Sequence, residues 1–158
     1  MYTVEKGFPS TKNKSDIYLK FPAILREKLR NGEIVFPSAT KYYFKPERAF
    51  RCIEREAEDF REVDRKDFRS YAELGRKKTR GQRIDTTDPA YYGVSLFRKR
   101  EIVENKMKFP NPHKKIAEGF VVQEGGPQHT NEETVHICWW LYSEADLSGF
   151  HVHQEVRR

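Results

Sequence analysis

The chain has few cysteines, no long apolar run and no sequence resembling a leader peptide. Its two cysteines, Cys52 and Cys138, are too few for a disulfide scaffold, so free thiols are the simplest expectation. A disulfide between them stays open, because both fall in predicted strands. No run approaches the roughly 18 apolar residues of a membrane-spanning helix, and residues 1–6 contain no apolar signal-peptide core. We therefore expect a cytoplasmic protein that does not insert into a membrane.

Internal repeats and low-complexity tracts are also absent, and the composition is that of a folded protein. Of 158 residues, 37% are hydrophobic and 13% are aromatic, which indicates a packed core even though 34% are charged. The net charge of +6 and the isoelectric point of about 9.3 favour a polyanionic partner, either nucleic acid or an acidic protein. A soluble basic protein without such a partner would show the same balance, because net charge does not report on fold.

Short helices and strands follow one another without the βαβ rhythm of a doubly wound fold. Helices are predicted from Pro22 to Asn31, from Asp64 to Leu74 and over residues 101–108, and a capped helical turn over 143–146. Strands are predicted over residues 34–36, 41–44, 49–53, 91–97, 116–122, 134–142 and 150–156. The predicted fold is a single α+β domain over residues 16–158, with an antiparallel or mixed sheet and two to four short helices. Residues 1–15 are predicted to form a polar N-terminal arm.

The segment over residues 76–83 is the clearest indication of a partner. It is predicted to be a loop with five basic side chains and no acid: Arg76, Lys77, Lys78, Arg80 and Arg83. Such a loop can follow a phosphate backbone, with added charge and base stacking from Arg98, Lys99, Arg100, Tyr91 and Tyr92. No motif for sequence-specific recognition is present. The leading prediction is a small interaction module without a cofactor that binds nucleic acid or an acidic protein; the alternative is a solvated loop that binds nothing.

Three of the five histidines lie near the C-terminal end of the sequence. In strands, His136 and Cys138 would share one face, and so would His151 and His153. These four N and S ligands would suffice for zinc, but their spacing matches no zinc template, so we predict no metal site. The alternative function is an enzyme: a metal-free, RNase-like toxin. Two histidines, or a histidine with Glu118 or Glu155, would act as base and acid, and Arg51, Arg80 or Arg83 would stabilise the phosphate transition state.

A second enzyme alternative comes from the order of elements between Phe50 and Val122. A strand with Arg51, a helix, a strand with Ser95, another helix and a strand with Glu118 follow one another. This order resembles the ADP-ribosyltransferases, in which an Arg or His, an aromatic or Ser, and a Glu or Gln line the pocket for NAD. The resemblance implies that Arg51, Ser95 and Glu118 line such a pocket. The structural alternative is a strand–helix–strand core in which Arg51 pairs with a nearby acid.

The two classes of function require different geometries. An enzyme requires His136, His151 or Arg51 to converge in a concave pocket. A binding module requires the basic loop to lie on an open, positive face.

Overall fold

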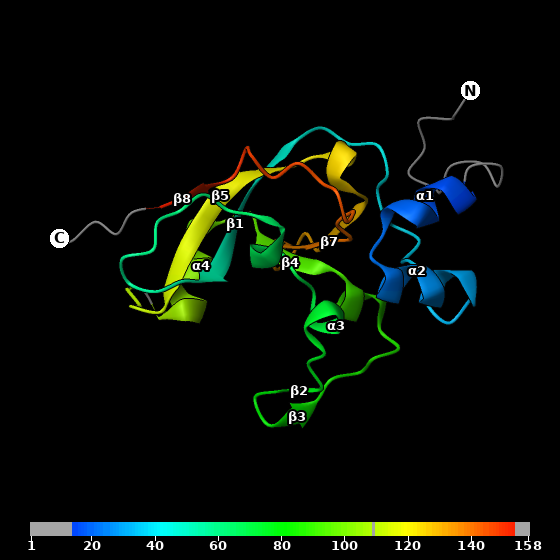
Figure 1. Cartoon of the computed structure of the whole chain (residues 1–158), viewed down its shortest axis with the longest axis horizontal. Coiled ribbons are helices and arrows are strands. Elements are labelled where there is room, and N and C mark those ends of the chain that lie inside the picture. The colour runs from blue at the N-terminus through cyan, green and yellow to red at the C-terminus, as the bar shows by residue number, and fades with distance from the viewer. Residues whose placement is uncertain (1–13, 109, 154–158) are drawn as a thin grey trace.

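The computed structural model describes residues 14–108 and 110–153, which form a six-stranded antiparallel sheet surrounded by short helices (Figure 1). The strands are β1 (Glu47–Glu54), β4 (Val94–Phe97), β5 (Lys114–Val121), β6 (Gln128–Thr130), β7 (His136–Trp139) and β8 (His151–Val152). Across the sheet they lie in the order β6-β7-β4-β1-β5-β8. A separate hairpin consists of β2 (Lys78–Thr79) and β3 (Gln82–Arg83). The predicted α+β fold is confirmed.

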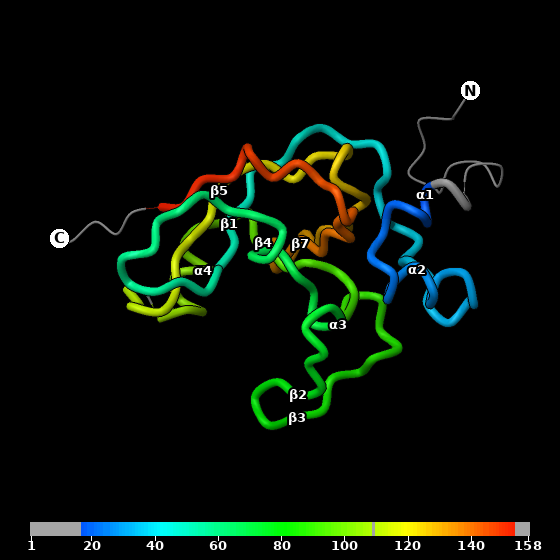
Figure 2. Tube along the Cα trace, viewed as in Figure 1, coloured from blue at the N-terminus to red at the C-terminus, as the bar shows by residue number. Residues whose placement is uncertain are grey.

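The helices in the described residues are short and lie around the sheet. They are α1 (Lys14–Lys20), α2 (Ala23–Arg30), α3 (Tyr71–Leu74) and α4 (Arg100–Met107), with the 3-10 turns η2 (Arg65–Asp67), η3 (Pro89–Tyr92) and η4 (Gln123–Gly125). Figure 2 shows α1 and α2 at one end of the molecule and β5 at the other, with the β2–β3 hairpin projecting from the body between them. Among the described residues, Lys78, Gln82 and Arg83 of the hairpin are exposed.

One face of the sheet carries the larger core. Leu96 of β4 and Ile137 of β7 are cross-strand partners with no exposed surface, and they point to this face together with Ala49 of β1. Phe68 and Phe150 cover them, with ring centroids 4.9 Å apart. This core fixes β1, β4 and β7 side by side.

The opposite face is covered in two parts. Helix α4 packs Val103 and Met107 against Phe50 of β1. At the β7 end, Trp140 joins Tyr92 of η3 in a second cluster, which also includes Leu25 of α2. Between helix α4 and the Trp140 cluster, neither cluster covers this face of the sheet.

The sheet is nearly divided between β1 and β4. Strands β1 and β5 pair over eight residues, whereas β1 and β4 pair only at Phe50 and Phe97. Beyond this pair the two strands separate. The side chain of Arg51 enters the separation and donates a hydrogen bond to the carbonyl oxygen of Ser95 at 2.8 Å. A side chain thus satisfies a strand carbonyl that no β1 backbone amide reaches.

Several element boundaries differ from those predicted, and capping explains two of the differences. The helix predicted from Asp64 to Leu74 is two turns, because Asp64 caps η2 and Ser70 caps α3, each with a reciprocal capping box. The strand predicted over residues 91–97 begins only at Val94, because Asp88 and Pro89 start η3 instead. Local side-chain hydrogen bonds therefore override the apolar pattern at both places.

Other predicted elements lack partners or extend outside the described residues. Residues 34–36 and 41–44 are not strands; Lys41 alone forms a bridge, to Gln128. Residues 143–144 form a turn and residues 145–146 have no regular structure, so the predicted capped helical turn is absent. Of the predicted N-terminal arm and the last strand, residues 1–13 and 154–156 lie outside the described part. Cys52 and Cys138 are both free thiols, so no disulfide joins them.

Candidate functional site

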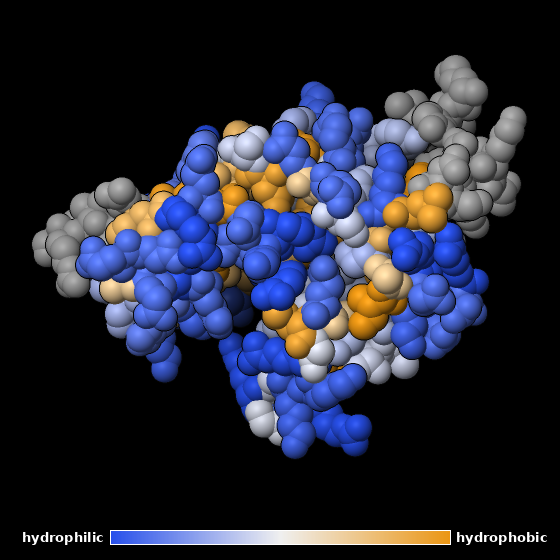
Figure 3. Space-filling model, in the orientation of Figure 1, coloured by the Kyte–Doolittle hydropathy of each residue, from blue (hydrophilic) through white to orange (hydrophobic). Residues whose placement is uncertain are grey.

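A cavity of about 850 Å³ opens beside the separation between β1 and β4. It is bounded by α4, by β4 and β7, and by residues of the 61–76 segment. Figure 3 shows the surface hollowed between the part that carries α4 and the projection that carries β2 and β3, with hydrophilic side chains around the opening. Its volume falls within the range of small-molecule sites, roughly 300–1,000 Å³.

Arg51 is half-buried and stands where the sheet separates. Its Nε donates to the carbonyl oxygen of Asp67 at 3.0 Å, and a terminal nitrogen donates to the carbonyl oxygen of Ser95. These bonds use two of the five N–H donors of a guanidinium group, which leaves donors for a ligand. Burial lowers the pKa of Arg51 to about 10, so the side chain keeps its charge at neutral pH.

Ser95 and His136 face one another across β4 and β7. The register pairs Ser95 with Cys138 and Phe97 with His136, so all four side chains point to one face. Ser95 Oγ and His136 Nε2 lie 2.6 Å apart. The pKa of His136 is lowered by burial and, to a smaller degree, by the charges of Lys106 and His129. His136 is therefore neutral at pH 7, and its Nε2 can accept a hydrogen bond from the Ser95 hydroxyl.

The charge of the cavity lining is predominantly positive. The lining contains seven basic side chains and four acidic ones; the basic ones are Arg51, Arg61, Lys66, Arg69, Arg76, Lys106 and Lys114. Among the described residues, only Arg61 of these seven forms an ion pair, with Asp59. Of the acids, Asp67 binds Arg55, Asp85 binds Thr87 and Asp88 caps η3. The remaining positive charges can attract an anion.

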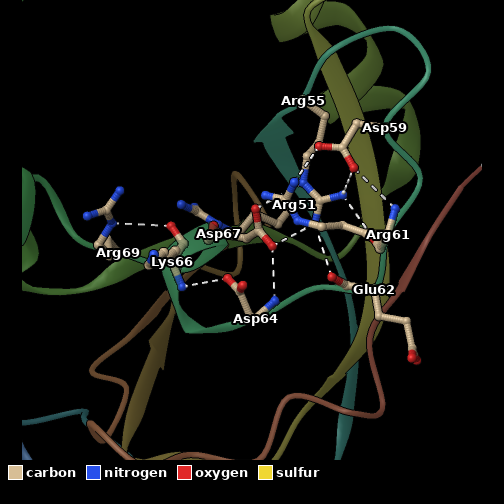
Figure 4. A network of polar contacts seen from close by, with 9 residues as sticks. All are labelled: Arg51, Arg55, Asp59, Arg61, Glu62, Asp64, Lys66, Asp67 and Arg69. Atoms are coloured by element: carbon tan, nitrogen blue, oxygen red, sulfur yellow. Dashed lines mark hydrogen bonds and ion pairs between the residues drawn. The ribbon is translucent and has the colours of Figure 1, made fainter.

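A polar network holds one side of this cavity in place (Figure 4). We call residues 55–70, which connect β1 to α3, the wall segment. The centre of the polar network is Arg55, whose side chain is 1% exposed. Arg55 forms ion pairs with Asp67 at 2.8 Å and with Asp59 at 3.4 Å. Arg55 also donates to the carbonyl oxygens of Arg61 and Glu62. The network adds polar contacts to a segment that Phe68 and Val63 also anchor to the core.

His151, His153 and Glu118 lie away from the cavity. The register runs from His136 through Phe97, Phe50 and Glu118 to His151, so His136 and His151 share a face. Strands β4, β1 and β5 lie between the strands that carry these histidines. Four strand spacings of about 4.8 Å therefore place the two histidines roughly 19 Å apart.

His153 Nε2 lies 2.6 Å from Glu118 Oε1, and Arg48 pairs with the same carboxylate. The structure thus brings together Arg51, Ser95 and His136, but not Glu118, which the resemblance implies for the same pocket.

The basic residues predicted to bind a partner fall into two groups. Arg76, Lys77, Lys78, Arg80 and Arg83 are all exposed, in and around the β2–β3 hairpin. Arg98 instead pairs with Glu47 and Glu132, and Arg100 pairs with Glu104; Lys99 is exposed at the start of α4. The first group is the more accessible for a partner.

Tyr91 and Tyr92 are part of the core. They are 6% and 5% exposed, and their hydroxyls donate to the carbonyl oxygens of Arg76 and Thr86. The exposed aromatic residue of this region is Tyr71 of α3, which lines the cavity with Leu74 and lies under the guanidinium group of Arg76 at 5.1 Å.

Sequence reasoning missed Tyr71, Lys106, Lys66 and Arg69 as lining residues. Each lies within a mixed run of charged or polar residues, and only the separation of β1 from β4 brings them to one cavity. The sequence does place Ser95 and His136 in predicted strands, which is the one indication that they could pair. The order of those strands in the sheet was needed to place them together.

Comparison with known proteins identifies no similar protein. No family model, curated protein or solved structure matches this chain. Across the described ranges, no three His, Cys, Asp or Glu side chains are grouped so that they could hold a metal ion. None of the helices in these ranges has the length and apolar character that crossing a membrane requires.

Proposed function

We propose that this protein is an enzyme that binds NAD in the cavity and transfers its ADP-ribosyl group. The observation that carries the proposal is the meeting of Arg51, Ser95 and His136 in a basic cavity where the sheet separates. Arg51 and Ser95 are two of the three residues for which the resemblance to ADP-ribosyltransferases implies this place. Glu118 does not line the cavity, and we assign the remaining role to His136 of β7.

The lining residues fit a dinucleotide. The pyrophosphate of NAD carries two negative charges, and the guanidinium group of Arg51 has free donors that match phosphate oxygens. Lys106 adds a positive charge from α4. Leu74 adds exposed apolar surface for a ring of NAD.

The chain contributes a base and a relay to this reaction. When NAD is bound, its C1′–nicotinamide bond breaks, nicotinamide leaves with the bonding electrons, and an acceptor atom bonds to C1′ and gives up a proton. The hydroxyl of Ser95 accepts that proton while it passes its own to Nε2 of His136. His136 can act in this way because its lowered pKa keeps it neutral at pH 7.

The proposal is tested by NAD binding and by nicotinamide release. The purified protein is expected to bind NAD in calorimetry and to release nicotinamide. Arg51→Lys keeps the charge but loses the two-pronged geometry, and the loss of charge-assisted hydrogen bonds worth about 1.5–3 kcal/mol weakens NAD binding roughly 10- to 100-fold. His136→Ala is expected to slow release about 10²- to 10⁴-fold. Arg30→Ala, on the exposed surface of α2, serves as the control. Absence of NAD binding by the unaltered protein would contradict the proposal.

A second candidate function is a module that binds a polyanion through the β2–β3 hairpin. The exposure of all five basic side chains over residues 76–83 favours it. Binding to an oligonucleotide is expected to weaken as salt rises, because bound counterions are released from the phosphates. Binding that is insensitive to salt, or that survives neutralisation of these side chains, would exclude the hairpin as the site.

A further inference from the structure

We infer that the acceptor of the transferred group is single-stranded nucleic acid, which the β2–β3 hairpin guides to the cavity. This inference rests on the proposed function and names its second substrate. Three features of the described residues support it: the charge of the hairpin, its position beside the cavity, and an exposed aromatic ring between the two.

The hairpin is built in a way that favours an anion beside it. Lys78 and Arg83 are direct cross-strand partners, and like charges in such a pair repel one another. The turn between them places Arg80 and Gly81 at positive φ values of 52° and 78°, as in tight two-residue hairpins. The described carboxylates form no ion pair with either Lys78 or Arg83. A phosphate next to this pair would relieve the repulsion.

Arg76 connects the hairpin to the cavity. It lies just before β2 and also lines the cavity, so it carries positive charge from the hairpin to the cavity. Lys66 and Arg69 of the wall segment extend this surface along the rim, and both are exposed. A phosphate backbone that follows the hairpin would therefore have basic side chains beside it as far as the cavity.

An exposed ring at the rim favours an unpaired strand over an acidic protein or a duplex. Tyr71 is 41% exposed, Leu74 is 47% exposed, and Arg76 lies over the ring of Tyr71. Unpaired bases stack on such rings, whereas an acidic peptide needs only the charges. In a duplex the bases are already stacked on one another, and their reactive atoms cannot enter a cavity.

The first experiment measures nucleic-acid binding without NAD. Fluorescence anisotropy compares a labelled single-stranded RNA of twelve nucleotides with the same sequence as a duplex, at several salt concentrations. The double variant Lys78→Ala/Arg83→Ala is expected to bind the single strand at least tenfold more weakly, and to reduce the salt slope by about 1.4 for two lost phosphate contacts. Tyr71→Ala should weaken binding of the single strand but not of the duplex.

The control is the double variant Arg30→Ala/Lys45→Ala, which removes the same charge from exposed positions elsewhere. It is expected to bind as the unaltered protein does. Equal losses in the two double variants would show that net charge alone is responsible, and would overturn the inference.

The second experiment follows the label of NAD carrying a radioactive phosphate. The expected result is label on the single-stranded RNA, with the hairpin variant transferring at least tenfold less label to RNA per nicotinamide released. Two results would overturn the inference and leave the proposed function standing: label that appears only on protein, or equal transfer to RNA by the hairpin variant and the unaltered protein. If the unaltered protein releases no nicotinamide, the proposed function and the inference both fail.

Discussion

The protonation state of His136 is set by residues on two different elements. Burial in β7 is the largest cause of its lowered pKa, followed by the charge of Lys106 on α4 and that of His129 on β6. Because the unfolded chain binds a proton more readily than the folded protein, His136 adds stability above its ordinary pKa of 6.5. That stability is lost as the pH falls below 6.5 and through the folded pKa.

Replacing Lys106 tests this account directly. Lys106→Met keeps most of the apolar stem and removes the charge, so the pKa of His136 is expected to rise toward its ordinary value. A pH titration of the His136 ring protons by NMR measures the shift. Lys45→Met, with an exposed lysine that does not line the cavity, is the matched control and should leave the titration unchanged. An unchanged midpoint in Lys106→Met would contradict the assigned cause.

At the scale of elements, the wall segment depends on one buried arginine. Burial alone would raise the pKa of Asp67, but hydrogen bonds from Arg55 and from the Asp64 amide outweigh it, and the pKa is lowered. The Asp67 side chain is only 7% exposed, so its charge depends on Arg55 for compensation. The wall segment therefore depends on this polar network as well as on the burial of Phe68.

We expect Arg55→Ala to destabilise the protein by about 3–5 kcal/mol, because it leaves the Asp67 carboxylate buried without its partner. Arg61→Ala removes an ion pair whose arginine is 62% exposed, and it should cost no more than about 1 kcal/mol. Urea unfolding of both variants measures the difference. Similar losses would show that the buried pair has no special role.

Strand β5 contains a glycine where the core leaves no room for a side chain. A Cβ at Gly119 would lie 2.6 Å from the ring of Phe150, which is itself packed against Phe68 and Trp139. Gly119→Ala should therefore lower the free energy of unfolding by about 1–3 kcal/mol. At Gly149, nothing lies within 4 Å of such a Cβ, so Gly149→Ala should change stability by no more than about 0.5 kcal/mol. Thermal unfolding of the two variants separates these outcomes.

Local patterns predicted the elements that depend on local signals. Pro22 before an apolar stripe gave α2, and the alternation over 49–53 placed Phe50 and Ile53 on opposite faces, as found. The residues 34–36 have the composition of a strand but join no sheet, and the Ile34 amide donates to the carbonyl oxygen of Lys28 instead. Strand existence could therefore be predicted better than strand pairing, which is set by contacts between distant parts of the chain.

The same limit applies to the candidate site. Arg51, Ser95 and His136 were each identified as candidates from the sequence, but for two different enzymes. Their meeting depends on β4 lying between β7 and β1, which is a property of the sheet order. Tyr91 and Tyr92 illustrate the opposite case, because aromatic residues beside a basic segment serve the core as readily as a ligand.

For the molecule as a whole, the two thiols report on the integrity of the fold. Burial raises the pKa of Cys138 to about 12 and also raises the pKa of Cys52. We expect both to react slowly with a thiol reagent in the native protein, since the thiolate is the reactive form. Addition of denaturant should release two reactive thiols per chain in one step. Fast reaction of two thiols without denaturant would contradict the burial, and a count below two would contradict the free state.

The line between β1 and β4 is where neighbouring strands of the sheet share the fewest backbone pairs. Each half has its own ladder, whereas across this line the strands share one residue pair and a hydrogen bond from Arg51, with the common core packed beneath both halves. Bending along this line breaks few backbone hydrogen bonds, so amides beside it should exchange with deuterium sooner than those in the β1–β5 ladder. A ligand held by Arg51 on one half and His136 on the other would brace the two halves. Occupancy of the cavity would then be readable as slower deuterium exchange of the amides along this line.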